Sequence, residues 1–207
     1  PTLDPARIVD IDGARIAAKL FNGLVAFNET LQPVPDIAAS WAVSADGRTY
    51  TFTLKPGVRF FNGRPVSADD FVYSFRRVLS PETRSPRTWV LSRIRGARQF
   101  MEGNAATVTG MRAPDNMTLV LHLKEPFAPF INFLGLTTAY VVPREEVDKW
   151  GADYGFHASG TGPFALKEWR HNQHILVRRN DFYFGEKPCL SGIRYDVIPE
   201  DFTALVS

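Results

Sequence analysis

The sequence predicts a mixed α/β fold in which helices and strands alternate. Three observations predict it: a helix with an N-terminal capping signature at 67–79, an alternating strand at 50–54, and a run of strands from 164 to 198. The chain has 207 residues, of which 44% are hydrophobic and 22% charged. That length and composition are sufficient to bury a core without a disulfide or metal.

Composition excludes several classes of protein. The 24 Lys and Arg residues nearly balance the 22 Asp and Glu residues, which argues against a protein that coats nucleic acid. The longest uncharged stretch, 127–142, contains proline, asparagine and glycine and is shorter than the roughly 20 apolar residues of a spanning helix. Cys189, the only cysteine, has no intrachain partner for a disulfide.

The first 40 residues contain three predicted segments. They are a helix over 12–22, a strand over 24–27 and a connector over 31–37. The Asn22-Gly23 pair is a natural helix stop. Pro33 and Pro35 remove backbone donors, so the third segment is expected to cross the surface as a connector.

A β-meander and a well-marked helix follow. The pattern predicts a turn at 44–47, a strand over 50–54, its partner strand over 58–61 and a turn at Asn62-Gly63. Ser67 as N-cap and Asp70 three residues later form a capping box ahead of apolar residues at helical spacing. Pro81 ends this helix.

The second half alternates helices with strands. Helices are expected over 87–102, 126–136 and 143–150, and strands over 118–123, 164–169, 174–179 and 193–198. Pro143 is expected at the first position of its helix and Gly151 beyond its end.

No constellation of residues predicts catalysis. Asp69 and Asp70 are adjacent on a helix and do not face one another, so capping explains them better than acid–base chemistry. His171 and His174 fall on a turn and a strand start, where they lack the helix and third ligand of a metal site. No nucleophile has a base near it in sequence. We therefore expect no enzyme, no cofactor and no metal.

Two further motifs have competing interpretations. The only basic cluster contains Trp89 and the arginines at 84, 87, 93, 95 and 98. It could bind the phosphate backbone of a nucleic acid, but we favour its interpretation as the solvated face of a helix. Gly160-Thr161-Gly162 completes no phosphate-binding motif, and Pro163 removes a donor that a phosphate site would use. A flexible crossing between subdomains is the better interpretation.

Eight short motifs, in colinear order over the whole chain, resemble the family 5 extracellular solute-binding proteins. They lie at 3–5, 20–24, 35–41, 50–60, 62–77, 125–127, 160–164 and 179–183. This family comprises the oligopeptide- and dipeptide-binding components of ABC importers. The resemblance implies lobe I of a type II-like periplasmic binding protein, with a smaller β-rich subdomain beside it.

The resemblance also implies a domain division. Residues 1–38 and 160–207 would form the core sheet of the lobe, 39–159 the smaller subdomain, and Gly160, Thr161 and Gly162 the hinge or return crossing. Family members are more than twice as long, so we expect an N-terminal fragment from which the second lobe is absent.

The implied function is a substrate-binding receptor that closes on a peptide and delivers it to the membrane permease of an ABC transporter. Its expected location is the periplasm or a lipid anchor on the outer face of the cytoplasmic membrane, and we expect a monomer that binds no nucleic acid. The length of the segment 99–115 favours the oligopeptide type. The alternatives are a receptor for a dipeptide, nickel chelate, opine or oligosaccharide, and a basic-patch module that contacts nucleic acid.

The family holds the peptide backbone as an added strand. The resemblance makes Val9, Asp10 and Ile11 candidates for backbone contacts, although some members have Glu in place of Val9. Arg87 stands where oligopeptide binders often present a Tyr, and it could pair with a ligand carboxylate. Trp89 could stack on a ligand side chain. Ordinary surface and core roles for Arg87 and Trp89 remain the alternative.

Overall fold

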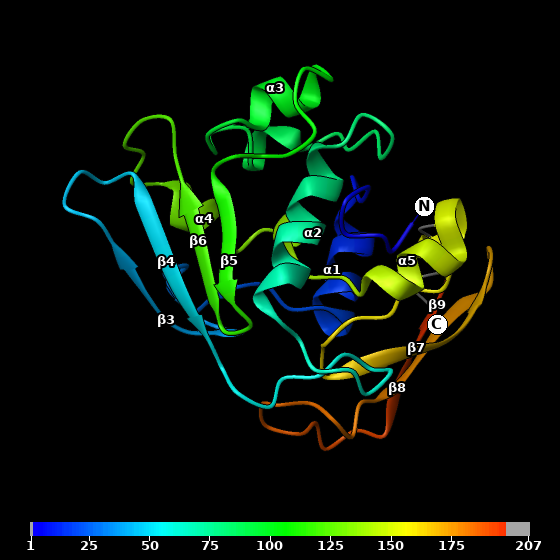
Figure 1. Ribbon diagram of the computed structural model, residues 1–207. Coiled ribbons are helices and arrows are strands. Elements are labelled where there is room, and N and C mark those ends of the chain that lie inside the picture. The colour runs from blue at the N-terminus through cyan, green and yellow to red at the C-terminus, as the bar shows by residue number, and fades with distance from the viewer. Residues whose placement is uncertain (1, 198–207) are drawn as a thin grey trace.

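The computed structural model describes residues 2–197, which form three antiparallel sheets with helices packed between and beside them (Figure 1). The sheets have the strand orders β1-β2, β3-β4-β6-β5 and β7-β8-β9. All strand pairs in these sheets are antiparallel, and helices α1 and α2 lie between the second and third sheets. The mixed α/β fold predicted from the sequence is confirmed.

The first helix and hairpin agree with the sequence except at the prolines. Helix α1 (Ile11–Leu20) is followed by strand β1 (Val25–Phe27), as expected. The prediction of a connector over 31–37 is wrong, because Pro33–Pro35 is strand β2 and pairs with β1. An edge strand tolerates alternating prolines, since its ladder bonds can pass through the residue between them, here Val34.

The four-stranded sheet consists of two hairpins that pair side by side through one strand of each. Its strands are β3 (Ala38–Val43), β4 (Thr49–Leu54), β5 (Met111–Asp115) and β6 (Thr118–His122). The predicted partner strand over 58–61 is wrong, because β4 is flanked on its two sides by β3 and β6. The segment 58–66 instead folds on itself, with the Val66 N–H donating to Val58 O.

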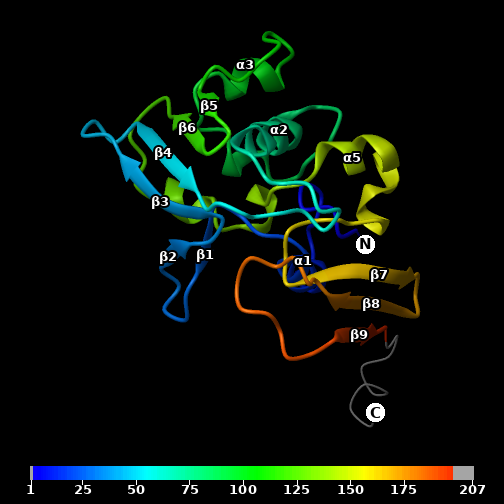
Figure 2. The ribbon, with the colours of Figure 1, turned by 60° about the horizontal axis from the view of Figure 1, so that its bottom comes forward.

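Helix α2 (Ala68–Leu79) covers one face of this sheet (Figure 2). The predicted capping box forms, and the Asp70 carboxylate accepts the Ser67 N–H at 2.8 Å. Phe71, Phe75 and Val78 are buried along one side of the helix, which is the helical spacing that the sequence predicts.

Two of the three later helices are shorter than predicted. The segment 87–102 contains only a 3₁₀ turn (Thr88–Val90) and helix α3 (Ala97–Met101), because Gly96 has a φ of 82° and Ile94 forms a bridge with Leu123. The segment 126–136 is helical only in α4 (Phe130–Phe133). A 3₁₀ turn (Thr137–Ala139) leads on to α5 (Arg144–Trp150), where Pro143 is the N-cap rather than the first helical residue, and a 3₁₀ helix (Gly151–Phe156) follows.

The third sheet confirms the predicted C-terminal strands. It consists of β7 (Phe164–Arg170), β8 (His174–Arg179) and β9 (Gly192–Asp196), each paired with the next. Ile198, the last residue of the predicted third strand, lies outside the described residues.

Buried apolar side chains form two clusters. The larger one fills the space between α2 and the four-stranded sheet, around Phe52, Phe71 and Phe75. The smaller one joins α1 to the third sheet and also contains Val147 of α5 and Tyr154. Within residues 2–197, no helix is long and apolar enough to cross a membrane.

Candidate ligand-binding site

The segment from Val9 to Ile11 emerges from the core as exposed backbone, which is extended at Asp10 and enters α1 at Ile11. Ile8 is 1% exposed, whereas Val9 is 64% and Ile11 71% exposed. Asp10 has φ −94° and ψ 159°, which is the conformation of a strand, and its carboxylate accepts the Gly13 N–H at 2.6 Å to cap α1. Two bulky aliphatic side chains are thus presented to solvent on either side of an extended residue.

The backbone donors of this segment are free. The N–H groups of Val9, Asp10 and Ile11 donate to no acceptor in the part of the chain that the structure describes. Ile11 is the first residue of α1 and therefore has no intrahelical acceptor. Consecutive free donors on exposed extended backbone are what an added peptide strand requires.

A buried ion pair fixes the base of this segment to α2. The Arg77 guanidinium donates to both Asp4 oxygens, at 2.8 and 2.6 Å, and the two side chains are only 12% and 3% exposed. Burial acts to lower the pKa of Arg77, but the bonds to Asp4 outweigh it and raise the pKa above its ordinary value. Asp4 also accepts the Ala6 N–H, so one carboxylate orders the turn that precedes Val9.

The structure brings Arg87 to the Val9 segment. Arg87 Nη2 donates to the backbone oxygen of Val9 at 3.3 Å, although the two residues are 78 positions apart. Trp89, in the adjoining 3₁₀ turn, is 48% exposed and rests edge-to-face on Phe133 at 5.0 Å between ring centroids. No sequence pattern pairs Phe133 with Trp89, since the apolar segment around Phe133 is expected to be an ordinary helix.

The crossing at Gly160, Thr161 and Gly162 is buried and closely bonded. Thr161 is fully buried, and its hydroxyl donates to Asn22 Oδ1 at 3.0 Å. A Cβ at Gly160 would lie 2.3 Å from Leu20 O, and one at Gly162 would lie 2.4 Å from Lys19 O. Glycine is therefore required where the crossing passes the end of α1, and the hinge role stays a prediction.

A polar cluster behind the crossing joins several of the sequence motifs. Asn22 donates to both oxygens of Asp36, at 3.0 and 3.1 Å, and the Gly23 N–H donates to Asp36 at 3.2 Å. Burial raises the pKa of Asp36, and these hydrogen bonds only partly oppose it. Asn180 closes the other side by donating to Gly162 O at 2.9 Å. These motifs therefore stabilise the lobe and do not face a ligand.

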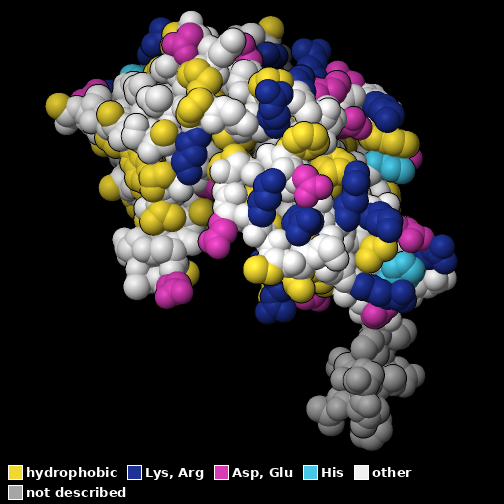
Figure 3. Space-filling model, turned by 90° about the horizontal axis from the view of Figure 1, so that it is seen from below, with side chains coloured by type: hydrophobic (Ala, Val, Ile, Leu, Met, Phe, Trp, Pro, Cys, Tyr) yellow, Lys and Arg dark blue, Asp and Glu magenta, His cyan; other side chains and the backbone are white. Residues whose placement is uncertain are grey.

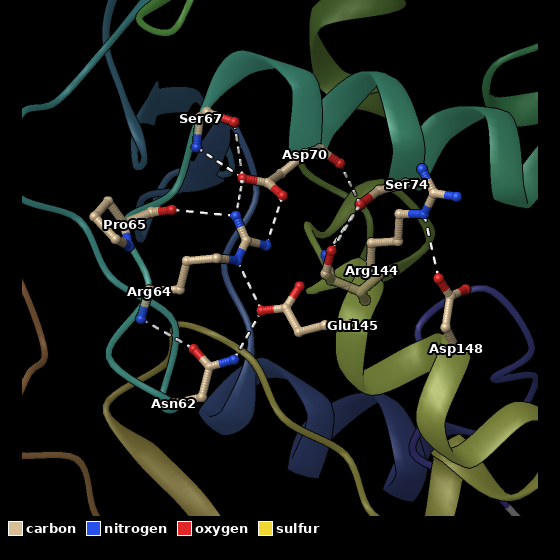
Figure 4. A network of polar contacts seen from close by, with 10 residues as sticks. Asn62, Arg64, Pro65, Ser67, Asp70, Ser74, Arg144, Glu145 and Asp148 are labelled. Carbon is tan, nitrogen blue, oxygen red and sulfur yellow. Dashed lines mark hydrogen bonds and ion pairs between the residues drawn. The ribbon is translucent and has the colours of Figure 1, made fainter.

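The Asp69-Asp70 pair serves the fold, as the sequence predicts. Figure 4 shows Arg64 between Asp70 and Glu145, with Asn62 donating to the same Glu145 oxygen at 2.8 Å. Arg64 donates to both oxygens of Asp70, at 3.0 and 2.7 Å, and to Glu145 at 2.7 Å. This network connects the start of α2 to α5.

Two of the five arginines in the basic cluster are paired with glutamates. Arg93 pairs with Glu125 at 2.6 Å and Arg98 pairs with Glu102 at 2.7 Å, while Arg87 is directed to Val9. Figure 3 presents the face on the opposite side from α3, where basic and acidic side chains are both present and hydrophobic side chains gather on one side. In residues 2–197, no group of three or more His, Cys, Asp or Glu residues could hold a metal.

The exposed backbone of Val9–Ile11 and the two buried cores belong to one lobe. The family model of bacterial extracellular solute-binding proteins, family 5 (Middle), matches residues 32–207, so the chain belongs to this family of solute-binding proteins.

Similar proteins include a periplasmic murein peptide-binding protein of Escherichia coli, 34% identical over 88% of this chain and 35% of its own length. A nickel-binding periplasmic protein of Escherichia coli is 31% identical over 91% of this chain and 34% of its own length. The solved substrate-binding domain of an oligopeptide ABC transporter from Bacillus anthracis has a TM-score of 0.94 and 30% identity, and the match covers 100% of this chain and 41% of that one. The chain thus spans little more than a third of the curated relatives' length.

Proposed function

We propose that this chain forms the first lobe of a peptide receptor that serves an ABC importer. The 207 residues would act together with a second lobe, which closes over the peptide and completes the cleft. Relatives that bind murein peptides and oligopeptides support this ligand class. The receptor would act outside the cytoplasm, in the periplasm or on a lipid anchor, and would deliver its peptide to the permease without any chemical step.

The single observation that carries the proposal is the exposed backbone at Val9–Ile11, with its free N–H groups. The Val9 and Ile11 N–H groups lie on either side of the extended residue Asp10, so both are available to one bound peptide. Main-chain bonds of this kind are independent of peptide sequence. They suit a receptor that accepts varied peptides.

Arg87 would add a side-chain contact to this backbone pairing. Its guanidinium lies against the Val9 carbonyl and, in the described residues, forms no ion pair with a carboxylate. It retains N–H groups for a ligand carboxylate, because a guanidinium carries five donors. The pairing of Arg93 and Arg98 with glutamates disfavours the alternative of a nucleic-acid module.

We also propose the division into 1–38 with 160–207 and 39–159. Support comes from the two apolar clusters, one around α1 and the third sheet and the other around α2 and the four-stranded sheet. The second cluster also takes in Leu24, Val25 and Ile37, so the strand β1 region packs against the proposed smaller subdomain. Val147 and Tyr154 belong to the first of these, so the 3₁₀ helix after α5 packs with the core sheet. The non-peptide ligands of the family, including nickel complexes, are the competing ligand class.

Ile11→Pro tests the backbone contact directly. Proline removes the Ile11 N–H, yet it is favoured at the first helical position and suits the extended conformation that Asp10 already has. We expect the full-length receptor to lose about tenfold in affinity for peptides, which corresponds to one hydrogen bond of about 1 kcal/mol or slightly more. The assay is isothermal titration calorimetry.

Ile11→Ala is the matched control, because it removes the side chain and keeps the N–H. It is expected to bind peptides within about threefold of the unchanged receptor. Equal affinities for Ile11→Pro and Ile11→Ala would contradict strand addition at this segment.

A further inference from the structure

Trp89 is unusually exposed for a tryptophan fixed in a rigid setting. Its neighbours Val90 and Leu91 are fully buried and hold the 3₁₀ turn in place, while Trp89 itself is 48% exposed. The ordered backbone thus holds a large apolar ring in contact with water.

Two phenylalanines pack in a row beside the indole ring. Phe133 contacts Trp89 edge-to-face, with an angle of 88° between the ring planes. The ring centroid of Phe127 lies 5.4 Å from that of Phe133, with an angle of 62° between the planes. Arg93 covers Phe127, with its guanidinium carbon 4.2 Å from the ring centroid. We call Trp89, Phe127 and Phe133 the aromatic shelf. Within the described chain, Phe133 is the only aromatic ring that pairs with Trp89, so much of the indole remains available.

The shelf is continuous with the candidate peptide segment. Arg87, two residues before Trp89, contacts the Val9 carbonyl, so one short loop serves both the free backbone and the exposed indole. A strand added at Val9–Ile11 projects alternate side chains to the same side, and the Arg87 contact brings the loop that carries Trp89 beside this segment.

We propose that the aromatic shelf is a subsite for an aromatic or large aliphatic side chain of the bound peptide. This subsite rests on the proposed function. Aromatic rings favour edge-to-face or offset contacts with other rings, and Phe133 already fixes Trp89 in one such arrangement. Phe133 is a positioning residue that holds the indole, and Trp89 makes the contact. The receptor thus combines sequence-independent backbone bonds with a preference for a bulky apolar residue at one peptide position.

The test measures peptide preference in the full-length receptor by isothermal titration calorimetry. The probes are tetra-alanine and the four tetrapeptides in which one alanine is replaced by phenylalanine. We expect one phenylalanine position to bind about tenfold or more tightly than tetra-alanine, since buried tryptophan contacts are typical hot spots. Trp89→Ala is expected to reduce that ratio to within about twofold.

Phe156→Ala is the matched control, because Phe156 is 41% exposed and lies in the 3₁₀ helix outside the shelf. It is expected to keep the full preference for phenylalanine. Phe133→Leu, which retains apolar bulk but loses the ring, is expected to reduce the preference for phenylalanine.

Four results would overturn the subsite. A preference that survives Trp89→Ala, or one that Phe156→Ala removes equally, would show that Trp89 does not make the contact. Equal affinity for all five peptides would reject the shelf and leave the proposed peptide receptor standing. Absence of binding to every peptide would reject both.

Discussion

Replacing Asp4 with alanine is expected to destabilise the lobe by about 3–5 kcal/mol, because it leaves the Arg77 guanidinium buried without its partner. The structure sets this magnitude. Two charge-assisted bonds of 2.8 and 2.6 Å are lost between side chains that are 12% and 3% exposed. The Ala6 N–H also loses its acceptor, for about 1 kcal/mol within that range. A domain of this size has a free energy of unfolding of about 5–15 kcal/mol, so the loss is a large fraction of the total.

Urea denaturation at neutral pH measures the effect. Glu102→Ala is the matched control, since it breaks an exposed pair with Arg98 and is expected to cost under about 1 kcal/mol. The double variant Asp4→Ala/Arg77→Met removes both charges and is expected to be more stable than the sum of the two single losses predicts. A cost below about 1 kcal/mol for Asp4→Ala, or strictly additive losses, would refute the reasoning.

Three further predictions concern the fold. Gly162→Ala places a Cβ 2.4 Å from Lys19 O and is expected to lower the free energy of unfolding by about 2–4 kcal/mol in urea; a loss below about 0.5 kcal/mol would mean that the crossing relaxes easily. Burial raises the pKa of Asp36, so the contribution of this group to stability should fall as pH rises from 3.8 through its raised pKa. Denaturation at several pH values should show the unchanged protein losing stability relative to Asp36→Asn over this window, and parallel slopes would contradict it. Arg64→Met removes the bonds to Asp70 and Glu145 and should cost about 1–3 kcal/mol by thermal unfolding, whereas an unchanged midpoint would make the network dispensable.

The sequence predicted those elements whose signals are local. The capping box of Ser67 and Asp70 and the strand signals in 164–169 and 174–179 depend on neighbouring residues, and both features are present in the structure. Elements that depend on distant partners were missed. The segment 58–61 has strand-like residues, but β6 takes the place beside β4 that it was expected to fill.

Helix breaks and edge strands were the other errors. Gly96 interrupts the predicted helix over 87–102. A Cβ at this position would clash with Thr109, and the residue has a positive φ. Neither condition is visible in the sequence. Pro114 made strand β5 difficult to predict from the sequence, just as Pro33 and Pro35 did for β2. Proline is compatible with such outer strands, because one side of their ladder has no partner.

The candidate site was predicted in parts and not as an assembly. The resemblance pointed separately to Val9 and to Arg87, and only the fold shows that the Arg87 side chain contacts the Val9 carbonyl. Phe133 carried no functional signal, because a phenylalanine in an apolar helix looks like core. Contacts between residues far apart in sequence are set by packing, which a single sequence does not encode in any local pattern.

The central claim is that this lobe belongs to a receptor for peptides. Mass spectrometry of the small molecules released by denaturing the full-length receptor, purified from the periplasm without added ligand, tests it most directly. The account predicts a heterogeneous set of peptides, because backbone pairing at Val9–Ile11 tolerates varied sequences. A single non-peptide mass, such as a metal chelate, would contradict it and leave only the family and the fold.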